Sequence, residues 1–284
     1  MRKLSKQEAI DIIYGCAVVG TGGGGNLQSG LKMIEECYNQ GNVVKMAELK
    51  ELGDDDFVAT PYGCGAPRLL ADNTEDPYAG LPRLDYPAPL LAFRTLEEYM
   101  GKKFFAVASS ELGAESTAEA LYIAGMLGIP IMNADAAGRS VPDLQYSTYF
   151  VKKKPIYPMA VATEFGETIL VKEVVDDFRA ESIARAIAVV SDNMVGIADH
   201  PMSGRDYKES VIPEAMTYAM QIGKILRETG AAGGDGYAVA ENIAKENKGR
   251  VMFRGTITEA PWETRDGYNY GTWQIGRASC RERV

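Results

Sequence analysis

The chain has 284 residues, of which 46% are hydrophobic and 24% charged, a balance typical of globular proteins long enough for two domains. Its formal net charge of -9, together with the lack of any basic run, excludes nucleic acid as an expected partner. No apolar stretch approaches the roughly 20 residues that cross a bilayer, and no signal peptide is recognisable. We therefore expect a cytoplasmic protein without membrane contacts.

The N-terminal segment carries a helix signal followed by a run of glycines. Ser5 and Glu8 have the spacing of a capping box, and apolar residues then recur at helical spacing, which predicts a helix over residues 6–17. The run Gly20-Thr21-Gly22-Gly23-Gly24-Gly25 cannot belong to a regular element, and a second helical pattern follows it. The run is therefore a loop that leads into a helix, and residues 68–89 read as a further, loop-like insertion.

A βαβ unit gives the clearest indication of the fold. Residues 104–109 and 130–133 read as buried strands, and the segment 116–127 between them reads as a helix. Glu111 follows the first strand and Asp135 the second, so both should lie at the carboxyl edge of a parallel sheet, where open α/β folds bind ligands.

The residue pattern changes after residue 154, and residues 159–172 read as a β-hairpin that begins a second unit. This unit includes a long helix predicted over residues 206–229. We expect an α/β protein with an N-terminal three-layer domain on a mainly parallel sheet (residues 1–154) and an α+β domain (155–274).

The last ten residues, 275–284, read IGRASCRERV, which matches the frame translation of a common sequencing adapter. We interpret this segment as an artefact in a metagenomic fragment and give Cys280 no functional weight. On this interpretation the natural gene continues beyond Gln274, and the second domain is incomplete.

The glycine run permits several interpretations. It satisfies the G-x-G-x-x-G dinucleotide pattern, but that fingerprint requires a strand before Gly20, and the sequence there has a helical pattern. Consecutive glycines ahead of a helix also present free amides that suit a carboxylate or an oxyanion. A tight turn that needs positive φ is an equal alternative.

Three charged residues are the candidates for chemistry. Glu111, at the end of a strand and beside glycine, could be a general base or could grip a substrate. Asp135 and Arg139 share one loop, where they could form either a structural ion pair or an anion clamp.

Cysteine, histidine and metal chemistry receive less support from the sequence. Cys64, between Gly63 and Gly65, is the cysteine in the most accessible context, whereas His200 has no nucleophile elbow near it, so a hydrolase triad is not supported. One histidine and scattered cysteines cannot build a His-rich or Cys-rich zinc site. No cofactor is predicted, and a carboxylate-bound divalent metal stays open.

Four segments, in order, carry a family resemblance: GTGGGGN, GCGAP, SSELGAES and NADAAGRSVPDLQYST. Together they resemble the N-terminal domain of the S-methyl thiohydantoin desulfurase family. Cys64 stands where that family is expected to have another residue, so a covalent cysteine is not implied. The resemblance assigns substrate binding to Gly22, Gly23, Gly24, Gly25, Asn26, Gly65, Gly113, Gly138 and Gln145.

The resemblance implies a hydrolase acting on a cyclic thioamide or amide, with Glu111 or Asp135 activating water. Arg139 would then hold a substrate carboxylate or ring oxyanion, and the glycine amides would stabilise developing charge. The alternative is a non-catalytic subunit that binds an anion or nucleotide and partners a hydantoinase-type enzyme. Convergence of Glu111, Asp135 and Arg139 on one cleft would favour catalysis, whereas scattered positions with separate partners would favour binding or a structural role. A homo-oligomer stays open.

Overall fold

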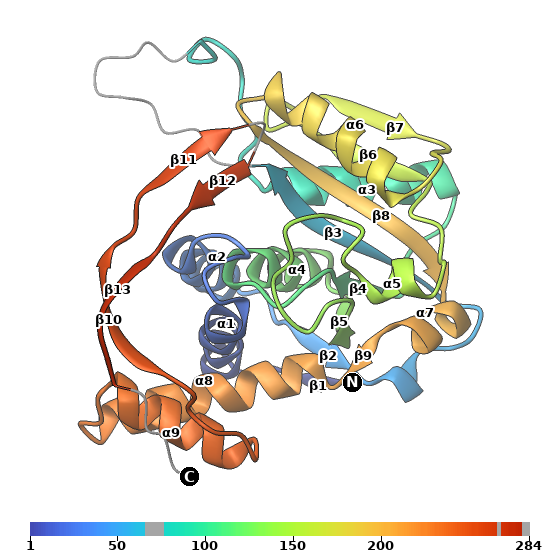
Figure 1. Ribbon diagram of the computed structural model, residues 1–284. Helices are drawn as coiled ribbons and strands as arrows, with labels where there is room; N and C mark the ends of the chain where they lie inside the picture. Colours follow the sequence, from blue (N-terminus) through green and yellow to red (C-terminus); the bar gives the residue numbers. More distant parts are fainter. Residues whose placement is uncertain (66–76, 266–267, 280–284) are drawn as a thin grey trace.

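The computed structural model describes residues 1–65, 77–265 and 268–279 (Figure 1). Residues 66 and 67 of the family-like GCGAP segment, the first part of the expected insertion (68–76) and residues 280–284 lie outside these ranges. The helices are α1 (Lys6–Gly20), α2 (Leu27–Asn39), α3 (Ala88–Met100), α4 (Ala114–Leu127), α5 (Thr148–Val151), α6 (Asp177–Val189), α7 (Gly204–Ser210), α8 (Ala215–Ala231) and α9 (Gly236–Glu246), with a 3-10 turn at Leu49–Glu51.

The strands form one large sheet and two small ones. They are β1 (Arg2–Lys3), β2 (Lys45–Ala47), β3 (Phe57–Gly65), β4 (Ala106–Ser109), β5 (Pro130–Asp135), β6 (Met159–Ala162), β7 (Thr168–Val171), β8 (Met194–Ser203), β9 (Ile212–Pro213), β10 (Arg254–Glu259), β11 (Trp262–Arg265), β12 (Tyr268–Gly271) and β13 (Gln274–Ser279). The large sheet has the order β1-β2-β5-β4-β3-β8-β6-β7, with β9 paired to β5.

The centre of the large sheet is parallel and its flanks are antiparallel. Strands β2, β5, β4 and β3 pair in parallel, whereas β8 pairs antiparallel with both β3 and β6. One hydrophobic cluster packs α1–α4 and α8 against one face, and two others pack α5–α7 against the opposite face. This three-layer arrangement confirms the predicted α/β class. The sheet continues through β8 across residue 154, where the sequence suggested a boundary.

The glycine run connects two helices. Helix α1 begins with the predicted capping box of Ser5 and Glu8 and ends at Gly20, followed by Thr21 in the left-handed region. Asn26 caps α2, since its side chain accepts from the amides of Gln28 and Ser29. A helix therefore precedes Gly20 where a dinucleotide fingerprint needs a strand, and the interpretation of this run as a nucleotide-binding fingerprint is wrong.

The long helix predicted over residues 206–229 is interrupted. Helix α7 ends at Ser210, the short strand β9 pairs with β5, and α8 begins at Ala215. Pro213 explains the break, because proline has no amide hydrogen and disfavours a helical residue before it. No helix in the described part of the chain has the length and apolar character needed to span a bilayer.

Helices α1 and α8 cross at very short range because glycines lie at the crossing. A methyl group on Gly15 would come within 1.7 Å of the Ala219 carbonyl oxygen, and one on Gly223 within 1.8 Å of the backbone carbonyl oxygen of Asp11. The Asp11 carboxylate also accepts two hydrogen bonds from Arg227, at 2.8 and 2.9 Å. This crossing fixes α8 beside the sheet.

Substituting Gly223 tests this crossing. Gly223→Ala should lower the free energy of unfolding by about 1–3 kcal/mol, because the added methyl group has no space and the helices must separate. Gly230→Ala is the matched control in the same helix, where a Cβ meets nothing within 4 Å; it should be neutral or stabilising by up to about 1 kcal/mol. Urea unfolding measures both. Equal effects from the two substitutions would contradict the proposed contact.

Candidate active site

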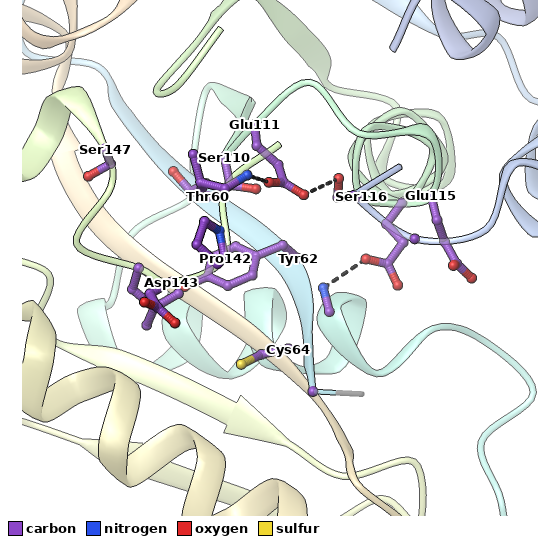
Figure 2. Close-up of a pocket in the computed structure, with 18 of the residues that line it drawn as sticks. Thr60, Tyr62, Cys64, Ser110, Glu111, Glu115, Ser116, Pro142, Asp143 and Ser147 are labelled. Carbon is purple, nitrogen blue, oxygen red and sulfur yellow. Dashed lines mark hydrogen bonds between the residues drawn. The ribbon is translucent and has the colours of Figure 1, made fainter. Parts of the chain in front are cut away.

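A cavity of about 620 Å³ lies at the carboxyl ends of β3 and β4, beside the glycine loop (Figure 2). Its walls come from segments that are far apart in the sequence: the loop before α2, strand β3, the start of α4, the loop after β5, helix α6 and strand β8. Its polar lining includes the side chains of Tyr62, Glu111, Glu115, Glu119, Asp143, Tyr149, Glu181, Arg185, Asp199 and His200.

Glu111 is held in place on the cavity wall by two hydrogen bonds. One carboxylate oxygen accepts from the Ser116 hydroxyl at 2.9 Å and the other from the Val141 amide at 2.7 Å. Burial raises the pKa of the Glu111 carboxyl, and these two donors oppose that shift. Its carboxylate is therefore oriented, shielded from bulk water and more basic than an exposed one.

Two further glutamates reach the cavity from α4. Glu119 is partly buried and accepts a hydrogen bond from the Gly63 amide at 2.8 Å. Burial raises its pKa to about 8, with a smaller contribution from the charges of Glu115 and Glu111. Glu119 therefore carries a proton at neutral pH. Glu115 accepts from the Asn26 amide at 2.7 Å and so ties α4 to the glycine loop.

The glycine loop lies close against the start of α4. A Cβ on Gly24 would be 2.2 Å from the Gly113 Cα and 3.2 Å from a Glu111 carboxylate oxygen, so only glycine fits there. Gly24 also has φ of 76°, in the left-handed region that favours glycine. The predicted binding residues Gly22, Gly23, Gly24, Gly25, Asn26 and Gly65 all line the cavity.

Three other predicted binding residues lie outside the lining. Gly113 lies behind Gly24, and its role is the close approach of two backbones. Gly138 has φ of 72° in the turn after β5. Gln145 donates to Asp143 at 3.0 Å, and so contacts a residue of the lining.

Asp135 is fully buried outside the lining. One carboxylate oxygen accepts from the amides of Ala137 and Gly138 at 3.2 and 2.7 Å, which closes the turn after β5. Its other oxygen is buried and has no partner among the described residues. Burial raises its pKa to about 7.

Arg139 is exposed and also lies outside the lining. Its guanidinium donates to the Thr21 hydroxyl and the Ser140 carbonyl, each at 3.0 Å. The described ion pairs include none between Arg139 and Asp135. Of the three charged candidates, the structure brings only Glu111 into the cavity lining.

The cavity lining also contains a buried polar pair, Asp199 and His200, which the sequence did not assign to the site. The Nδ1 of His200 is 2.9 Å from Asp199, whose other oxygen accepts from the Tyr62 hydroxyl. The His200 ring packs at a tilt against the Tyr149 ring, and His200 adopts φ of 45°, a rare conformation for a residue other than glycine. The signal in the sequence was the Asp-His pair itself, which lies within β8 and reaches the cavity through the antiparallel β3–β8 pairing.

Helix α6 supplies the third wall, which sequence reasoning also missed. Arg185 donates to Glu181 at 2.6 Å and to the Pro142 carbonyl at 3.2 Å, while Glu181 accepts from the Leu144 amide. These contacts hold α6 against the loop of residues 141–145. In Figure 2, Asp143 and Pro142 of that loop lie on the opposite side of Tyr62 from Glu115.

The geometry does not favour Cys64 as a nucleophile. Its side chain is buried, and burial raises the pKa of the thiol to about 12, so the reactive thiolate is scarce near neutral pH. Among the described residues, no group of three or more His, Cys, Asp or Glu side chains is arranged to hold a metal ion.

Residues 7–173 match a family model described as S-Me-THD-like, N-terminal domain, and residues 175–283 match S-Me-THD-like, C-terminal domain. A crystal structure of a protein from Chromobacterium violaceum aligns with a TM-score of 0.73 and 21% identity, over 93% of this chain and 71% of that one. This likeness shows a shared fold. No curated protein matches the chain.

The raised pKa of Glu119 makes stability depend on pH. Because the folded state keeps a proton on Glu119 up to about pH 8 and the unfolded chain loses it near the ordinary glutamate pKa of 4.5, stability should fall as pH rises across this window. The slope from one proton is at most about 1.4 kcal/mol per pH unit. Glu119→Gln should flatten this pH dependence because the amide does not titrate. The fold should be kept, since the amide oxygen can still accept from the Gly63 amide.

Urea unfolding of both proteins at several values between pH 5 and pH 8 measures this slope. Glu98→Gln, at an exposed position of α3, removes an acid from the surface and is the control. If the Glu119 and Glu98 variants kept the same slope as the unmodified protein, the proton would not reside on Glu119.

Proposed function

The chain belongs to the S-Me-THD-like family, the S-methyl thiohydantoin desulfurase-like proteins, and we propose that it hydrolyses a thiohydantoin-type ring in the cavity described above. The observation that carries the proposal is a pair of carboxyl groups on one cavity wall, Glu111 and Glu119, whose pKa values are both raised by burial. Paired carboxyls whose surroundings differ are the usual means of general acid and base catalysis near neutral pH.

In the proposed reaction, water adds to the ring carbon that bears the sulfur. Glu111 takes one proton from that water as the carbon–oxygen bond forms. The carbon–sulfur bond then breaks as the carbonyl forms. One of the two water protons ends on the departing sulfur and the other on the ring nitrogen of the former C=N bond. The products are a hydantoin and a thiol, so atoms and charge balance without an added reactant.

Glu111 is the stronger of the two candidate bases. Its carboxylate lines the cavity, whereas Asp135 is buried outside the lining and uses one oxygen to close its own turn. A base must come within hydrogen-bond reach of the proton that it removes. We therefore assign the base to Glu111 and a structural role to Asp135.

Glu119 has the properties of the matching acid. With a pKa of about 8 its carboxyl is protonated at neutral pH, so it can donate to the ring nitrogen as water adds. The second proton of the adding water then restores it. Base and acid belong to the same short segment, the end of β4 and the first turns of α4.

The glycine loop can stabilise the negative charge that develops in this step. The amides of Gly22, Gly24 and Gly25 make no hydrogen bond to another described residue, and all three glycines line the cavity. Fixed amides directed at developing charge typically contribute a few kcal/mol. Arg139 lies outside the lining, and we assign it no contact with the substrate.

Removing the base should stop turnover. Glu111→Gln should lower kcat for an S-methyl thiohydantoin by about 100-fold or more with little change in KM, because the amide cannot accept a proton from water. Asp135→Asn is the matched control, since its amide oxygen can still accept from Ala137 and Gly138, and it should stay within a few-fold of the unmodified protein. Release of thiol, followed with a thiol-reactive dye, measures both.

A larger loss with Asp135→Asn than with Glu111→Gln would move the base to Asp135. If the unmodified protein bound a hydantoin but released no thiol from any thiohydantoin, the proposal of hydrolysis would fail and a binding subunit would take its place.

The acid-base pair also predicts a bell-shaped pH profile of kcat. Activity should fall as pH drops through the raised pKa of Glu111, which then gains a proton, and should fall again above about pH 8, where Glu119 loses its own. Glu119→Gln should lower kcat by about 100-fold and remove the alkaline limb while the acidic limb stays. An unchanged alkaline limb in that variant would assign the limb to another group.

A further inference from the structure

The cavity carries an excess of negative charge. Among its described lining residues there are six carboxyl groups, of which that of Glu119 is protonated at neutral pH, against one guanidinium, that of Arg185, and one imidazole, that of His200. The carboxyl groups are those of Glu111, Glu115, Glu119, Asp143, Glu181 and Asp199. In a partly enclosed site such an excess raises the local concentration of cations and disfavours anions.

The two basic groups do not reverse this excess, because each lies beside an acid. Arg185 and Glu181 pair at 2.6 Å, and both side chains are mostly buried. His200 is 2.9 Å from Asp199. The charges of Glu111, Glu115 and Asp143 have no cationic partner within the described residues, and each of these three faces the same cavity.

Asp143 has a carboxylate oxygen in need of a donor. One oxygen accepts from Gln145 at 3.0 Å, but the other, Oδ1, is buried and makes no hydrogen bond to any described group. Leaving such an acceptor unpaired costs about 1–3 kcal/mol. Because Oδ1 is buried, the Asp143 carboxylate has to turn toward the cavity before the N–H group of a ligand can reach it. Asp143 lines the cavity in the loop that Arg185 holds through Pro142.

From these observations we propose that the cavity selects rings whose substituent carries a positively charged nitrogen and excludes rings with a free carboxylate. In this proposal the Asp143 carboxylate accepts a hydrogen bond from the charged nitrogen. The substrate class is then a thiohydantoin or hydantoin with a basic side chain. This inference rests on the proposed function for the identity of the ring, but its charge preference concerns binding and does not require turnover.

Calorimetric titration with two hydantoins tests the preference. One carries an aminobutyl group on ring carbon 5 and the other a carboxyethyl group, so ring and approximate length are matched while the charge is reversed. The amine should bind about tenfold more tightly or better at low salt, and the preference should shrink as ionic strength rises from about 0.05 to about 0.5 M, because salt screens charges.

Two variants locate the effect. Asp143→Asn removes one charge but can still accept from Gln145, and should cut the preference for the amine by about threefold or more. Asp55→Asn removes one charge from an exposed turn at residues 54–55 and should leave the preference unchanged. This control separates a local effect of Asp143 from the overall charge of the protein.

The outcomes separate this inference from the proposed function. Equal or tighter binding of the carboxylate ligand, or an identical effect of Asp143→Asn and Asp55→Asn, would overturn the charge selection even if thiohydantoin hydrolysis were observed. Preferential binding of the amine without release of thiol from the corresponding aminobutyl thiohydantoin would uphold the selection and refute the hydrolysis.

Discussion

The contact between the glycine loop and the first turn of α4 is the constraint on which the site depends. Helix α4 has no side-chain cap at Gly113, and its amides at Glu115 and Ser116 instead donate to the Gly24 carbonyl at 2.8 and 3.3 Å. In return Glu115 accepts from the Asn26 amide. The two segments thus satisfy each other's free backbone groups, which would otherwise be costly where water is scarce.

This reciprocal contact explains why several glycines are needed and how Glu111 is oriented. Gly24 and Gly113 must touch backbone to backbone for the Gly24 carbonyl to reach the start of α4. Once α4 is fixed in this way, Ser116 is in position to donate to Glu111. A side chain at Gly24 would therefore disturb the helix start and the candidate base together.

Local signals in the sequence predicted the elements that carry this contact. The capping box at Ser5 and the β4–α4–β5 unit depend on residues near one another in the chain, and both are present as expected. Glu111 and Asp135 followed from the same rule, that of a carboxylate after a parallel strand. They differ because Asp135 can reach amides two and three residues ahead and closes its own turn, whereas Glu111 is held by partners further along the chain.

The rest of the site could not be predicted because it depends on contacts between distant segments. Glu119 looks like part of an exposed acidic helix face, and it is shielded because β3 passes beside it at Gly63, where no side chain intervenes. Arg185 and His200 reach the cavity because β8 pairs with β3 in antiparallel register. Such a pairing leaves no mark in the local spacing of residues.

Because β8 extends the sheet next to β3, both of the segments that match the family models contribute residues to the cavity. Glu111, Glu119 and the glycine loop belong to residues 7–173, whereas Arg185 and His200 belong to residues 175–283. The first segment supplies the proposed acid and base, and the second supplies the part of the lining that comes from α6 and β8. Within the first segment, the raised pKa of Glu119 comes mainly from burial, and β3 lies beside this carboxyl at Gly63. The cavity is therefore complete only when both matched segments have folded.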